Sequence, residues 1–140
     1  MEHWQITLVV LLVIFGGIAF ELHRRRFTRV VQSKLNSRPH LTAEQFGRMY
    51  FGASTLRANM AADLRNIIAK HLPVSINGLH PDDKFQETLM MDMFDSMTTV
   101  EIIMEIEERF GIKRGDDEEI RPDISFRQLV DYVERRARMK

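Results

Sequence analysis

The sequence feature that most constrains the fold is an apolar run near the N-terminus. Residues 4–20 read WQITLVVLLVIFGGIAF, seventeen residues without a charge. At about 1.5 Å of rise per residue, a helix of this length is at the short end of what crosses a bilayer core of about 30 Å. Leu22 and the flanking side chains lengthen it, and Trp4 stands where interfacial aromatic residues occur. The run therefore predicts a single transmembrane helix over residues 1–22, with membrane contact through residues 4–20.

The charges around this run predict whether it is cleaved and how it is oriented in the membrane. A secretory signal peptide carries positive residues before the apolar run, but no Lys or Arg precedes this one. The positive cluster follows the run: Arg24, Arg25, Arg26 and Arg29. This order favours an uncleaved anchor over a signal peptide, and the lack of a polar face argues against a buried core helix. Positive residues stay in the cytoplasm, so in a bacterium we expect a single pass through the inner membrane with the rest of the chain cytosolic. The arginines serve as a topology signal alone or also contact anionic lipid headgroups.

Composition excludes several classes of site. The chain of 140 residues has no cysteine, which excludes disulfides, thiolate metal sites and cysteine nucleophiles. Its five histidines are scattered without ligand-like spacing, so no metal site is predicted. The net charge of zero hides an asymmetry: residues 1–79 carry a net +6, residues 80–134 a net −10, and residues 135–140 a net +4. The acidic part would repel nucleic acid and attract basic protein surfaces, so we expect no nucleic-acid partner.

Residues 23–55 are predicted to form a basic linker that contains a short amphipathic helix. Pro39 breaks the preceding segment. Thr42 and Gln45 have the spacing of a capping box, which predicts a helix over AEQFGRMYF. Phe46, Met49 and Tyr50 share one face of that helix. Its apolar face packs on the following domain or lies on the membrane surface, and both placements remain open.

The second half of the chain, residues 56–140, is predicted to be a small all-α bundle because no stretch alternates as a strand does. The first helix has one apolar stripe: Leu56, Met60, Leu64, Ile67, Ile68 and Leu72. A helix starting near Asp95 and ending at Gly111 has apolar residues at helical spacing: Met97, Val100, Ile103, Met104, Ile106 and Phe110. The last helix follows Ser125, its predicted cap, with an inner face of four residues: Phe126, Leu129, Val130 and Val133.

From Leu56 to Arg136 this arrangement resembles the acyl carrier protein family. Asp95-Ser96-Met97 stands where the family has Asp-Ser-Leu, and VEIIMEIEERFGI resembles the family's acidic second helix. The resemblance implies a non-enzymatic carrier with 4′-phosphopantetheine esterified to Ser96, whose flanking motif residue is Asp95. The thiol of that group holds acyl intermediates as thioesters. A serine at a helix N-terminus suits this group, since the positive end of the helix stabilises the phosphodiester charge.

Two residue counts compete for the position of the serine. Counting forward from Phe85 and Leu89 puts Asp92-Met93 in the Asp-Ser position, three residues away from Ser96. Counting back from Phe110-Gly111 puts Ser96 there, and we prefer this count because it aligns a whole helix and loops tolerate insertions. The preceding segment MMDMF could start the helix one turn early, which would place Ser96 inside it. The ordinary alternative for Ser96 is a helix N-cap, for which Asp95 is equally suited.

The leading hypothesis is a membrane-tethered acyl carrier protein in lipid metabolism, such as fatty acid biosynthesis. Its expected partners are a phosphopantetheinyl transferase and acyl-activating or acyl-transferring enzymes, which dock on Glu101, Glu105 and Glu108 unless these form an ordinary solvated face. The alternative is an unmodified carrier-like interaction module that docks a basic partner through the same acidic helix. A hydrolase using Ser96 with His80 and a carboxylate is a third, weaker hypothesis, because no oxyanion motif accompanies the serine.

Overall fold

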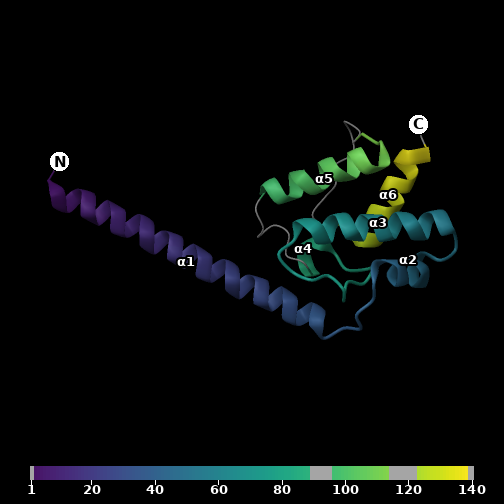
Figure 1. The fold of residues 1–140 in the computed structure, drawn as a ribbon, viewed down its shortest axis with the longest axis horizontal. Coiled ribbons are helices and arrows are strands. Elements are labelled where there is room, and N and C mark those ends of the chain that lie inside the picture. Colours follow the sequence, from purple (N-terminus) through teal and green to yellow (C-terminus); the bar gives the residue numbers. More distant parts are fainter. Residues whose placement is uncertain (1, 89–95, 114–122, 139–140) are drawn as a thin grey trace. The chain divides into compact units, whose positions relative to one another are not determined.

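The computed structural model describes residues 2–88, 96–113 and 123–138, and in these ranges helices joined by loops make up the chain (Figure 1). The helices are α1 (His3–Asn36), α2 (Ala43–Phe51), α3 (Thr55–His71), α4 (Phe85–Thr88), α5 (Ser96–Phe110) and α6 (Phe126–Arg138). In the described ranges the only β-type pairing is an isolated antiparallel bridge between Lys84 and Ser125. The predicted all-α class is therefore confirmed. The chain divides into two compact units, residues 1–30 and 31–140.

The first unit is the greater part of α1, which contains the predicted transmembrane segment. Its apolar side chains are exposed along the whole run; Val13, for example, is 70% exposed and Phe20 is 69% exposed. The most apolar 18-residue window has a mean hydropathy of 2.2 and no buried residue. By length and composition this helix could cross a membrane. After the apolar run, Glu21 forms ion pairs of 3.1 Å with both Arg24 and Arg25.

In the second unit, α3 is the central helix, and α2, α5 and α6 each contact it (Figure 1). The predicted inner face of α6 is confirmed, because all four of its residues are buried. The predicted stripe of α3 is also buried, from Met60 to Leu72. Leu56, in the first turn of α3, is the exception, because it is 73% exposed.

Helix α2 packs on α3, which decides between the two placements that the sequence left open. The capping box is present: the Gln45 amide donates to Thr42 Oγ1 at 3.2 Å, and the Thr42 amide donates to Gln45 Oε1 at 3.0 Å. Phe46 is fully buried, and its ring meets that of Phe126 edge-on at 5.1 Å. Met49, predicted to share the face of Phe46, is 66% exposed.

The last turns of α1 also belong to the second unit. Val31 and Leu35 are 0% and 1% exposed. Gly78 passes so close to this helix end that a Cβ at that position would collide with the Leu35 carbonyl oxygen. Part of the segment predicted as a linker, residues 31–55, thus lies in the same compact unit as residues 56–140. The functional boundaries at 22 and 55 stay predictions.

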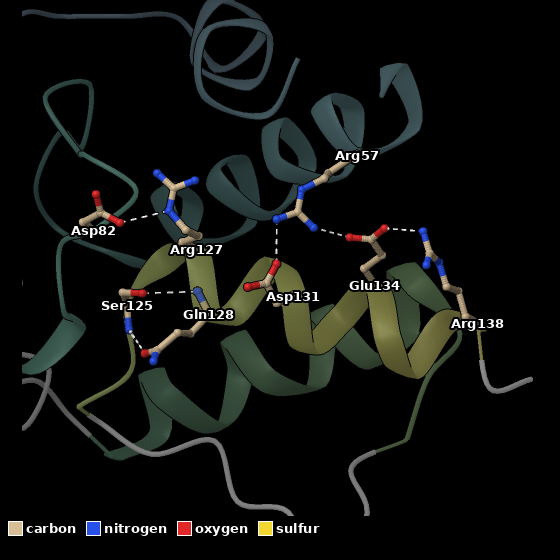
Figure 2. Close-up of polar contacts among 8 residues, drawn as sticks. All are labelled: Arg57, Asp82, Ser125, Arg127, Gln128, Asp131, Glu134 and Arg138. Atoms are coloured by element: carbon tan, nitrogen blue, oxygen red, sulfur yellow. Dashed lines mark hydrogen bonds and ion pairs between the residues drawn. The ribbon is translucent and has the colours of Figure 1, made fainter. Parts of the chain in front are cut away.

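Ion pairs fix α6 against α3 (Figure 2). The guanidinium of Arg57 donates to Asp131 Oδ1 at 2.6 Å and also pairs with Glu134. Glu134 in turn accepts from Arg138 at 2.6 Å. The hydrogen bond to Asp131 raises the pKa of Arg57, with a further contribution from Glu134.

The start of α6 is fixed by a second capping box (Figure 2). The Gln128 amide donates to Ser125 Oγ at 3.2 Å, and the Ser125 amide donates to Gln128 Oε1 at 2.8 Å. The predicted cap at Ser125 is therefore confirmed. Arg127 extends from this first turn to Asp82 in the loop before α4, with 2.9 Å between Nε and Oδ1.

Candidate functional site

Ser96 is the first residue of the fifteen-residue helix α5. The first four N–H groups of any helix lack an intrahelical acceptor, and the helix dipole adds partial positive charge at this end. The position therefore suits a covalently attached phosphate group. The flanking Asp95 and the segment MMDMF, which could start the helix one turn earlier, lie outside the described residues.

Packing against α3 decides which side of α5 is exposed. Ile102 and Ile106 are 6% and 2% exposed and form its buried side. At 100° per residue, the opposite side carries Met97, Val100 and Met104, which are 57%, 46% and 61% exposed. The sequence grouped these three residues with Ile106 in one apolar series and left Ile102 out, and the structure corrects that grouping. The exposed apolar stripe of Met97, Val100 and Met104 is the part of the site that sequence analysis missed.

The three predicted docking carboxylates differ in their surroundings. Glu101 and Glu108 are exposed and lie beside the apolar stripe, because residues 97, 101, 104 and 108 follow one another along one helix face. Glu105 lies at the edge of this face, where it meets α3. Its Oε1 accepts from Lys70 Nζ at 2.9 Å, and its Oε2 contacts His71 Nε2. The hydrogen bond from Lys70, and next that from His71, lowers the pKa of Glu105.

The C-terminal half of α5 is held by further contacts. Arg109 pairs with Asp63 of α3 at 2.9 Å. Gly111 has a φ of 60°, and the Ile112 amide donates back to the Glu107 carbonyl at 3.0 Å. This is a glycine C-cap, and it confirms the predicted stop at Gly111. These contacts fix the orientation in which α5 shows its acidic and apolar face.

The histidine invoked in the hydrolase hypothesis has other contacts. His80 Nδ1 accepts from the Asp82 amide at 3.1 Å, and its ring packs against that of Tyr50 at 5.0 Å between centroids. Within the described ranges, no group of three or more His, Cys, Asp or Glu side chains is arranged to hold a metal ion.

Comparison with protein families gives a match over residues 62–132, to the family described as "Phosphopantetheine attachment site". The matched region runs from α3 into α6 and includes Ser96. No solved structure gives a significant match.

Curated relatives match about half of the chain. An "Acyl carrier protein 3" of Ralstonia nicotianae is 34% identical over 71 residues, which are 51% of this chain and 77% of the relative. An "Acyl carrier protein" of Campylobacter hominis is 33% identical over 51% of this chain and 86% of its own. An "Acyl carrier protein" of Rubrobacter xylanophilus is 35% identical over 55% of this chain and 90% of its own.

Proposed function

We propose that Ser96 is the attachment residue of this chain, because the chain belongs to the acyl carrier protein family, which carries covalent 4′-phosphopantetheine. Acyl carrier proteins are carriers without catalytic activity of their own, and they act with acyl-handling enzymes and a phosphopantetheinyl transferase. The observation that carries the assignment is the position of Ser96, the first residue of α5 and within the region that matches the family.

The residues around Ser96 fit the group. The hydroxyl of Ser96 would form the phosphodiester bond, and the positive end of α5 would stabilise its negative charge. When bound, the group supplies a thiol that carries acyl chains as thioesters. A supplied thiol is consistent with a chain that has no cysteine of its own.

We further propose that acyl-activating or acyl-transferring partners dock on α5. Glu101 and Glu108 offer carboxylates to Lys and Arg side chains of a partner, while Met97, Val100 and Met104 offer apolar contact area. Interfaces commonly combine an apolar centre with a charged rim. Charge complementarity on such a face increases association rates and selects partners.

The third part of the proposal is a membrane tether. Residues 4–20 would span the inner membrane once, with the arginines at 24–26 and 29 on the cytosolic side together with the carrier unit. Exposed apolar side chains along α1 support this. A tether would raise the concentration of the carrier near membrane-bound acyltransferases, which suits lipid metabolism such as fatty acid biosynthesis. Carbonate extraction of membranes tests it: the full chain should stay in the pellet, and release into the supernatant would contradict the tether.

The attachment is tested by intact mass. Coexpression of the full chain with a phosphopantetheinyl transferase should add one phosphopantetheine mass, and Ser96→Ala should abolish the gain. Ser125→Ala is the matched control, because Ser125 also stands at the start of a helix in the same unit but should not affect the modification. A gain that persists in Ser96→Ala contradicts the assignment. An unmodified wild-type protein would favour the alternative, an interaction module that docks a basic partner without the arm.

A further inference from the structure

The carboxylate of Glu105 is occupied by cationic groups of the chain itself. Lys70 Nζ lies 2.9 Å from Oε1, and His71 Nε2 contacts Oε2, so both oxygens are engaged. His71 also reaches the neighbouring carboxylate, with 3.5 Å between its Nδ1 and Glu101 Oε2. These two residues end α3, whereas both glutamates lie on α5. The end of α3 therefore supplies positive charge to the edge of the acidic face.

The two cationic residues differ in how easily they can be displaced. The side chain of Lys70 is 67% exposed, whereas those of Glu105 and His71 are 29% and 18% exposed. A long, solvated lysine can leave its partner at little cost, because exposed ion pairs contribute little to stability. The imidazole of His71 is held between the helices. Lys70 is thus the group that an incoming Lys or Arg would replace.

We propose that Lys70 is an internal competitor for the basic residues of docking partners, so that a partner engages Glu105 only by displacing it. Lys70 thereby sets the affinity of α5 for basic partners and limits docking to those whose Lys or Arg reaches this edge. This inference rests on the proposed docking function of α5. It adds a residue of α3, outside the acidic helix, to the determinants of partner choice.

The size of the effect follows from the strength of an exposed ion pair. An ion pair of this kind raises the dissociation constant of a partner that competes for the same carboxylate by about two- to fivefold. Removing Lys70 should tighten partner binding by that factor, and the gain should shrink at high salt.

The test uses the full chain in neutral detergent micelles, with a broad-specificity phosphopantetheinyl transferase as the basic partner. Ser96→Ala is present in every variant, so the titration measures binding without modification. We expect Lys70→Gln to lower the dissociation constant about two- to fivefold and Lys70→Arg to leave it unchanged. Arg109→Gln is the matched control: it removes one positive charge from a different ion pair between α3 and α5, with Asp63, but leaves Glu105 bound.

A double-mutant cycle separates competition from overall charge. In a Glu105→Gln background, Lys70→Gln should give no gain, because there is no carboxylate left to release. The inference is overturned by an unchanged dissociation constant for Lys70→Gln, by an equal gain for Arg109→Gln, by a gain that persists without Glu105, or by no binding in any variant. Failure of the proposed attachment would be seen separately, as a missing mass gain in protein with Ser96 intact.

Discussion

Phe46→Ala should destabilise the second unit strongly although residue 46 lies outside the region that matches the family. The side chain of Phe46 is fully buried between α2 and the helices it packs on. Its ring meets Phe126 edge-on at 5.1 Å and Tyr50 at 5.4 Å, and the Arg65 guanidinium lies 5.0 Å from its centroid. A residue in a flexible linker would have none of these contacts.

The magnitude follows from the burial and the ring contacts. Truncating a buried Phe to Ala costs about 3–5 kcal/mol through lost transfer free energy and the cavity left behind. Edge-on aromatic pairs add about 0.5–1.5 kcal/mol each beyond area burial, which places Phe46→Ala toward the upper end of that range. Since domains are stable by only about 5–15 kcal/mol, the loss is a large fraction of the total.

Urea unfolding of the full chain in micelles, followed by circular dichroism at 222 nm, measures this loss. With an m value of about 2 kcal/mol/M, the midpoint should fall by about 1.5–2.5 M at an unchanged slope. Met49→Ala is the matched control, because Met49 lies in the same helix and is 66% exposed. A loss below about 1 kcal/mol, no larger than that of Met49→Ala, would refute the placement of α2 in the core.

Two further predictions concern α5 and the end of α1. The pKa of Glu105 is lower in the folded state, so its ion pairs stabilise the fold above the usual carboxyl pKa, and this contribution is lost as pH falls through the folded-state value. The free energy of unfolding should therefore fall between about pH 5 and pH 3 more steeply in the wild type than in Glu105→Gln, and parallel curves would contradict the pairing. Gly78→Ala should cost about 1–3 kcal/mol, because the new Cβ meets the Leu35 carbonyl oxygen. Gly16→Ala, with open space around it, should leave the urea midpoint unchanged.

Local signals predicted the structure well where one short segment contains all the information. The cap at Ser125 and the four apolar residues that follow it at helical spacing predicted both the start of α6 and its buried side. The capping box of Thr42 and Gln45 did the same for the start of α2. Caps and helical periodicity depend on neighbours within a few residues, so they can be read without knowing the tertiary structure.

The exposed side of α5 could not be read in this way. Apolar residues occur on both sides of this helix, and periodicity alone does not say which side faces α3. The structure buries Ile102 and Ile106 and exposes Met97 and Met104. For the site, the sequence left open whether the helix starts at Ser96 or one turn earlier, and the residues that precede Ser96 lie outside the described ranges. The pairing of Glu105 with Lys70, 35 residues earlier in the chain, depends on tertiary packing and left no local signal.

The folded carrier unit begins earlier in the chain than the region that is similar to the family. The family match begins at residue 62, but the compact unit begins at residue 31. The intervening residues contribute Val31 and Leu35 from the end of α1 and Phe46 and Phe51 from α2, all with at most 2% exposure. Burying four such side chains is worth several kcal/mol, which is comparable with the whole stability of a small domain. Residues 31–55 are therefore part of the carrier unit, and a soluble form of the carrier must keep them.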